Sequence, residues 1–217
     1  MQYLLSPTLS HYLLLFPSCP LLPPFLSYTR WGLVGNVSEA GFLHCRSLQV
    51  LSLRGLDALV GGLPKGLGKH CPDLRVLDVS ATHLHRPMRV SGRIPKSLGK
   101  CKGLRRLVLA GCEALTGDIP KSLGNCRKLQ LLNLSRCSGL TGAIPSEIGR
   151  CAELREMYLT FCSGLVGALP EDITQQCLAL QVLGLHGTEA GREQTHVVLY
   201  AGIDPDVVPT KRREGRA

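Results

Sequence analysis

Cysteines are the residues of this chain whose type and spacing could do chemistry. Ten cysteines in 217 residues could form disulfides or ligate a metal ion. Six of them instead form two series, each with a period of 25 residues: Cys101, Cys126 and Cys151 in the first, and Cys112, Cys137 and Cys162 in the second. A cysteine that recurs once per unit marks a sequence repeat, and we predict that these side chains are small buried hydrophobes.

The motifs of common enzyme classes are absent from the sequence. No H-E-x-x-H, C-x-x-C, G-x-S-x-G or nucleotide-binding G-x-x-x-x-G-K-[ST] pattern occurs. The nearest metal-ligand candidate is His83 with His85, close to Cys71, and two histidines alone are a weak signal. We therefore predict a protein that is not an enzyme and that holds no catalytic residues, no cofactor and no metal ion.

The repeat extends beyond the cysteines. A proline recurs at the same period, and aligning on it gives the unit C-x-x-L-x-x-L-x-L-x-x-C-x-x-L-x-G-x-I-P-x-x-L-G-x. Residues 101–125 match every fixed position of this unit. A repeat of this length indicates a solenoid, in which stacked coils share one core because a single coil cannot bury its apolar side.

Each unit predicts its own local structure. The L-x-L segment is a short strand whose alternate residues point inward, and glycine and proline turn the chain back afterwards. We predict an α/β solenoid in the form of a short horseshoe arc, with a parallel β-sheet on the concave side and irregular, 3-10 or short helical structure on the convex side. A column of aliphatic residues should close the convex side: Leu67, Leu98, Leu123, Ile148 and Ile173.

The unit resembles the leucine-rich repeat family. The segments LTGDIPKSLG (115–124) and LTGAIPSEIG (140–149) are similar to the plant-type subclass, and the cysteine columns are similar to the cysteine-containing subclass of intracellular ubiquitin-ligase adaptors. The chain departs from the plant type where that subclass has a buried asparagine ladder, since it has Cys112, Cys137 and Cys162 there. The resemblance implies a binding module.

Four segments follow from the extent of the repeat. Residues 45–190 hold about six units of 25–30 residues, one of them lengthened near 85–90 by an insertion that includes His83, His85, Arg86 and Arg89. Residues 31–44 resemble the back half of a degenerate unit and are predicted to cap the core, with Trp31 as a plug. Residues 1–30 are predicted to be a disordered, apolar, proline-rich leader, and residues 191–217 a disordered charged tail.

Charge and hydropathy restrict the class of partner. The net charge is +9, and most of it lies on the repeats, where lysines and arginines flank the cysteines. These cations form either a solvated rim or a surface for an acidic protein or a lipid surface. Without aromatic stacking residues or a groove-reading motif we expect no specific nucleic-acid partner. No apolar run is long enough for a transmembrane segment, and we expect a monomer.

The outward positions of the strands form columns on the concave sheet, and one part of these columns has the residue types of a binding surface. Aromatic and arginine side chains are enriched where binding energy concentrates. The predicted partner-binding residues are Arg106, Asn133, Arg136, Glu156, Tyr158 and Phe161.

Three functions agree with this surface. The first is a protein-recognition adaptor or scaffold in signalling, cytoplasmic because unpaired cysteines persist most easily in a reducing compartment. The second is the ligand-sensing part of a receptor-like or secreted defence protein, at the cell surface or outside the cell, where Asn36 and Asn133 match the glycosylation pattern. The third is a fragment of a larger leucine-rich repeat kinase or GTPase.

Overall fold

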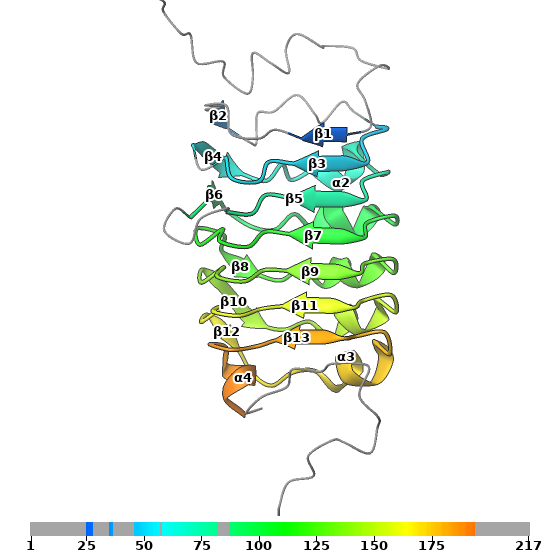
Figure 1. Cartoon of the computed structure of the whole chain (residues 1–217), viewed down its shortest axis with the longest axis vertical. Coiled ribbons are helices and arrows are strands. Elements are labelled where there is room, and N and C mark those ends of the chain that lie inside the picture. Colours follow the sequence, from blue (N-terminus) through cyan, green and yellow to red (C-terminus); the bar gives the residue numbers. More distant parts are fainter. Residues whose placement is uncertain (1–24, 28–34, 37–45, 57, 82–86, 194–217) are drawn as a thin grey trace, which may run out of the picture.

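The computed structural model describes residues 25–27, 35–36, 46–56, 58–81 and 87–193, and these residues form one stack of coils (Figure 1). A seven-stranded parallel sheet runs the length of the stack in the order β1-β3-β5-β7-β9-β11-β13. Its strands are β1 (Phe25–Ser27), β3 (Val50–Ser52), β5 (Val76–Asp78), β7 (Arg106–Val108), β9 (Leu131–Asn133), β11 (Glu156–Tyr158) and β13 (Val182–Gly184). The predicted parallel sheet is thereby confirmed.

The register of this sheet follows the repeat. Equivalent positions of neighbouring units pair directly, as in Arg106 with Leu131 and Leu131 with Glu156. Each central residue of β3 to β13 is buried and the residues on either side of it are not, as the alternation of a strand with one solvated face requires. The predicted columns therefore lie side by side on the concave sheet.

A second side of the stack carries two three-stranded parallel sheets, in the orders β2-β4-β6 and β8-β10-β12. Their strands are β2 (Gly35–Asn36), β4 (Leu59–Gly62), β6 (Arg89–Ser91), β8 (Gly117–Asp118), β10 (Leu140–Ala143) and β12 (Leu165–Val166). A bridge between Gly92 and Leu115 links the two sheets. The sequence predicted only a turn in this part of the unit, so these strands are an addition to the predicted fold.

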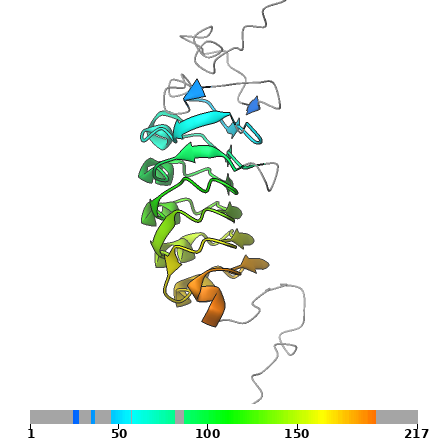
Figure 2. The same cartoon turned by 90° about the vertical axis from the view of Figure 1, so that its left-hand side faces the viewer.

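One short helix per coil lies on a further side of the stack, and these helices are stacked on one another (Figure 2). They are α2 (Leu67–His70), η3 (Lys96–Lys100), η4 (Lys121–Asn125), η5 (Ser146–Arg150) and α3 (Glu171–Gln176). The four from η3 to α3 each begin directly after a proline in an extended conformation, which cannot itself continue a ladder. The predicted aliphatic column, from Leu67 to Ile173, consists of residues of these helices, and all of its members are fully buried, which confirms the prediction for the convex side.

Glycines in the helices set how closely the coils approach. A Cβ on Gly124 would lie 2.0 Å from the carbonyl oxygen of Glu147 in the next coil, and one on Gly99 would lie 2.3 Å from that of Ser122. No side chain fits at such distances. The glycine that follows the buried aliphatic residue in α2, η3, η4 and η5 is therefore required by the stacking of one helix on the next.

The stack extends beyond the predicted repeats at both ends. β1, within the predicted leader, pairs with β3 through Phe25 and Val50 and adds a strand to the concave sheet. β2, within residues 31–44, pairs with β4 as the back half of a further coil. At the other end the helix α4 (Glu189–Glu193) follows the last strand and extends just past residue 190. Trp31 lies outside the described residues, as do His83, His85 and Arg86 of the insertion.

α4 closes the C-terminal end of the stack through its first residues. The Glu189 carboxylate accepts a hydrogen bond of 2.7 Å from the Gly167 backbone N–H in the preceding coil. The buried Thr188 hydroxyl donates to the Leu185 carbonyl and accepts from the Gly191 N–H. Among the described residues, no helix has the length and apolar character that crossing a membrane requires.

Candidate functional site

The cysteine columns are part of the core. Eight cysteines lie in the described residues; all eight are buried, and none of them forms a disulfide there. In the second column each thiol donates a hydrogen bond to a backbone carbonyl of the preceding coil: Cys112 to Val79 at 3.2 Å, Cys137 to Leu109 at 3.1 Å and Cys162 to Leu134 at 2.9 Å. The prediction of buried side chains is confirmed, but the hydrogen bonding was missed. The signal was available, since these cysteines occupy the position of a buried asparagine ladder.

Burial makes these thiols unreactive. Desolvation, together with the nearby carboxylate of Asp78, raises the pKa of Cys112 to about 12. The pKa of Cys101 and that of Cys151 are likewise raised to about 12, mainly by burial. A nucleophilic or metal-ligating cysteine must be a thiolate, and these remain thiols at neutral pH. No cluster of His, Cys, Asp or Glu that could hold a metal ion occurs in the described ranges.

The feature of the concave face that resembles a binding site is an aromatic cluster at the ends of β9, β11 and β13. The Phe161 side chain is 49% exposed. Its ring makes an edge-to-face contact with His186, with centroids 5.2 Å apart. The Arg136 guanidinium carbon lies 5.6 Å from the centre of the same ring, within the range of a cation–π interaction.

Two members of this cluster hold a costly backbone conformation. Arg136 and Phe161 have φ of 62° and 60°, and they are the two non-glycine residues of the described chain with positive φ. Equivalent positions in other units carry glycine, at Gly55, Gly111 and Gly187. The left-handed conformation costs a residue with a Cβ about 1–2 kcal/mol. Hydrogen bonds of 2.7 Å from the Arg136 and Phe161 N–H groups to the next coil hold it in place.

The other predicted site residues are arranged in smaller groups. The Tyr158 hydroxyl donates a hydrogen bond of 3.0 Å to the Glu156 carboxylate on the same strand. The Asn133 side chain accepts one of 3.0 Å from the Ser135 N–H. Arg106 stands apart, because Leu131 of β9 lies between it and Glu156 in the sheet. His186 was not among the predicted site residues, although its place in the outward column after β13 was the available signal.

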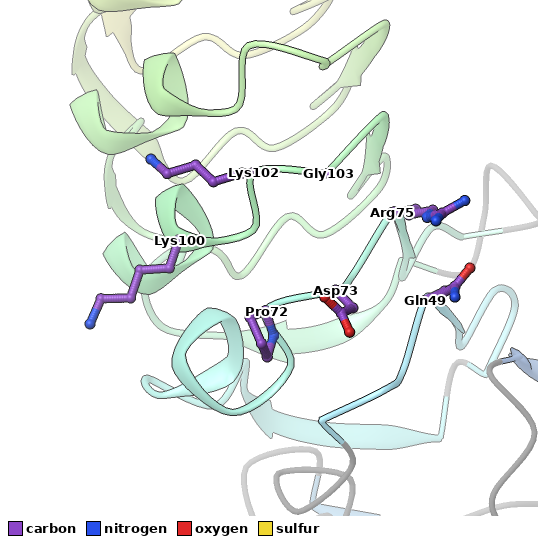
Figure 3. Close-up of a pocket in the computed structure, with 7 residues that line it drawn as sticks. All are labelled: Gln49, Pro72, Asp73, Arg75, Lys100, Lys102 and Gly103. Atoms are coloured by element: carbon purple, nitrogen blue, oxygen red, sulfur yellow. The ribbon is translucent and has the colours of Figure 1, made fainter.

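Two hollows lie away from this cluster. One, of about 460 Å³, opens where the chain enters β5 and β7, and Figure 3 shows its charged side chains diverging: Lys100 and Lys102 extend to one side, and Arg75 to the other, past Asp73. The second is a groove of about 1680 Å³ along the Ile-Pro segments, with Lys65, Arg93 and Lys96 at its rim. In the first hollow, therefore, these charged side chains do not converge on a common point.

The chain is similar to known leucine-rich repeat proteins in sequence and in fold. A family model described as Leucine Rich Repeat matches residues 128–151. No match was found among curated proteins. The solved structure of a TDR receptor matches with a TM-score of 0.55 and 23% identity over 72% of this chain, and this chain spans 30% of that one.

Two further solved structures come from Arabidopsis thaliana. The leucine-rich repeat ectodomain of the receptor kinase SOBIR1 matches with a TM-score of 0.50 and 22% identity, over 64% of this chain and 68% of that one. A chain of the BIR3–SERK2 complex is 34% identical, with a TM-score of 0.44, over 55% of this chain and 58% of its own length. The chain thus spans less than two thirds of the length of the TDR receptor and of the matched chain in the BIR3–SERK2 complex. The repeated unit, the family-model match over residues 128–151 and the shared fold together show that the described coils form a leucine-rich repeat solenoid.

Proposed function

We propose that this chain is a non-catalytic recognition module whose protein or peptide ligand binds the concave sheet around Phe161. The proposed contact residues are those predicted from the sequence, with His186 added: Arg106, Asn133, Arg136, Glu156, Tyr158, Phe161 and His186. The observation that carries the proposal is the half-exposed Phe161 ring in a conformation that glycine adopts without strain at three equivalent positions.

Strain of this kind supports a functional role. Costly backbone conformations persist where the surrounding structure enforces them, and they cluster at binding and active sites. Here the conformation projects a ring, flanked by a guanidinium and an imidazole, from the open end of a strand. Aromatic and arginine side chains at the centre of an interface contribute most of its binding energy. Glycine at this position would allow the same fold without strain. We therefore attribute the presence of an exposed phenylalanine here to contact with a ligand.

The favoured setting is a receptor-like or secreted protein. Its support is the repeated L-x-G-x-I-P segment, together with the receptors among the solved structures that share the fold. The cytoplasmic prediction depended on unpaired cysteines. That argument loses its weight because a buried, protonated thiol resists oxidation in any compartment. An adaptor inside the cell remains the second candidate, and membership of a larger receptor kinase is a further proposal.

Replacement of Phe161 by glycine is expected to separate binding from stability. The variant relieves the strain at φ 60°, so the free energy of unfolding should stay the same or rise by about 1 kcal/mol. Affinity for a partner captured with the wild-type chain should fall more than tenfold, because the central ring is lost. Chemical denaturation and biolayer interferometry measure the two quantities.

The matched control for this experiment is Leu178→Ala. Leu178 is an exposed apolar residue, 86% accessible, that lies outside the cluster, and its loss should leave affinity within twofold of wild type. If Phe161→Gly binds the partner as tightly as wild type does, the ligand does not use this face.

The compartment has its own test. A secreted or cell-surface chain should carry glycan mass at Asn36, since a glycan at Asn133 would cover the proposed binding face, while its eight core cysteines remain unpaired. Intact-mass spectrometry of protein from its native source, with alkylation before and after unfolding, reports both. An unglycosylated protein recovered with the cytosolic fraction would instead support the adaptor.

A further inference from the structure

The loops that lead into β7 and β9 carry a concentration of positive charge. These loops run along the right-hand edge of the stack in Figure 1. Six exposed lysines and arginines from two neighbouring coils lie in the loops or directly beside them. We call them the basic stripe: Lys100, Lys102, Arg105, Arg106, Arg127 and Lys128.

The segments that carry these charges contain no acidic residue. Residues 99–112 and 119–146 contain no aspartate or glutamate. Within the part of the chain that the structure describes, no member of the stripe forms an ion pair; the pair that does form is Lys121 with Glu147, at 3.5 Å. The Lys102 ammonium group donates to the Gly99 carbonyl at 3.2 Å, which leaves its charge uncompensated. The stripe therefore offers positive potential to an external anion.

Each of the two coils that flank the stripe contains an exposed acidic residue, with an exposed arginine, Arg75 or Arg155, in the same coil. Asp73 is exposed in the coil before it, and Glu153 is exposed in the coil after it, where it accepts a hydrogen bond from Gln130. A broad anionic surface such as a membrane would also cover these carboxylates and be repelled by them. An anion that spans only two coils, which are stacked about 4.8 Å apart, would avoid both.

The residue types of the stripe disfavour nucleic acid. Proteins that bind single strands stack bases on aromatic side chains, and residues 99–112 and 125–135 contain no aromatic residue. A peptide with closely spaced carboxylates requires no such platform. Arg106 also belongs to the concave sheet as the first residue of β7, so the stripe is continuous with the face proposed to bind the ligand.

We propose that the basic stripe binds a short acidic segment of a protein partner, rich in aspartate and glutamate, that extends from the concave face across the edge of the stack. This inference rests on the recognition role proposed above, but it does not depend on the Phe161 cluster. Exposed charges of this kind act mainly on the rate of association and on the choice of partner. Their effect should weaken as salt shortens the Debye length.

The test uses a fluorescein-labelled peptide of ten glutamates, with a peptide of ten glutamines as its neutral counterpart. Fluorescence anisotropy at low salt should detect binding of the first and not the second. The triple variant Arg105→Gln, Arg127→Gln and Lys128→Gln should bind the glutamate peptide at least tenfold more weakly. Its circular dichroism melt should match wild type, because all three side chains are exposed.

The matched control removes the same charge from another face. The variant Lys65→Gln, Arg93→Gln and Lys96→Gln loses three exposed cations at the rim of the Ile-Pro groove and should bind the peptide within twofold of wild type. Equal losses in both triple variants would overturn the proposal, because net charge alone would then explain the binding.

Two further probes separate the acidic segment from other anions. Tighter binding of phosphatidylserine vesicles or duplex DNA than of the glutamate peptide, lost in the stripe variant, would also overturn the proposal. Phe161→Gly should leave binding of the glutamate peptide unchanged. A failure of the concave site and a failure of the stripe therefore give different results.

Discussion

Replacing Leu132 by aspartate is expected to unfold the solenoid. Leu132 is the central residue of β9, is fully buried, and pairs in the sheet with Leu107 on one side and Met157 on the other. A carboxylate at this position would have no partner in an aliphatic core, and burying an unpaired charge costs several kcal/mol. A single domain is stable by only about 5–15 kcal/mol. Because the coils share one core, the damage should spread to both neighbours.

The control for this variant is Asn133→Asp, one residue further along the same strand. The Asn133 side chain points outward and accepts a hydrogen bond from the Ser135 N–H through an oxygen that aspartate retains. Thermal melts by circular dichroism should show no cooperative transition for Leu132→Asp and a transition near that of wild type for Asn133→Asp. Melts of the opposite kind would mean that the inward and outward faces differ from this register by one residue.

The second large effect is a loss of stability at alkaline pH. Burial raises the pKa of the Cys101, Cys112 and Cys151 thiols from an ordinary value of 9.0 to about 12, and that of Cys126 and Cys162 to about 11. Between pH 9 and these values the unfolded chain releases protons that the folded chain keeps. The folded state therefore binds more protons, and stability falls as pH rises.

The size of this effect follows from the number of thiols. Each buried cysteine removes about 1.4 kcal/mol per pH unit once the pH exceeds its unfolded pKa. Five such groups together could remove the whole free energy of unfolding within about two pH units. Full stability should hold below pH 8, and unfolding should approach completion near pH 11.

Guanidinium denaturation at a series of pH values from 7 to 11 measures this slope. Cys112→Ser is the matched variant, since its hydroxyl can still donate to the Val79 carbonyl but does not ionise in this range. Its stability should fall less steeply than that of wild type, by about 1.4 kcal/mol per pH unit. If stability does not change between pH 8 and pH 10.5, folding does not raise the pKa of these thiols, and the argument from burial is wrong.

The repeat in the sequence determined the concave sheet and the core. Leucines at fixed positions of every unit specify which residues point inward, so the pairing of Arg106 with Leu131 and the burial of Leu123 and Ile148 followed directly. Stacking identical units leaves only one register in which all leucines meet. The outward column that holds Tyr158 came from the same alternation.

The strands on the second side of the stack depended on tertiary structure. Segments such as Leu140–Ala143 contain glycine and alanine, which have low strand propensity. They are strands because the neighbouring coil supplies a parallel partner, as Gly117 does for Leu140. β1 has the same origin, since Phe25–Ser27 lies outside the repeat and pairs only because β3 presents a free edge.

Part of the candidate site was also predictable from the sequence, and part of it depends on tertiary structure. Alternation within a strand is a local property, so the sequence placed Tyr158 and Phe161 on the outer surface. It could not tell that Arg136 and Phe161 adopt positive φ or that His186 contacts the Phe161 ring. Those facts depend on how one coil rests on the next, because the next coil supplies the hydrogen bonds and contacts that hold each side chain in place.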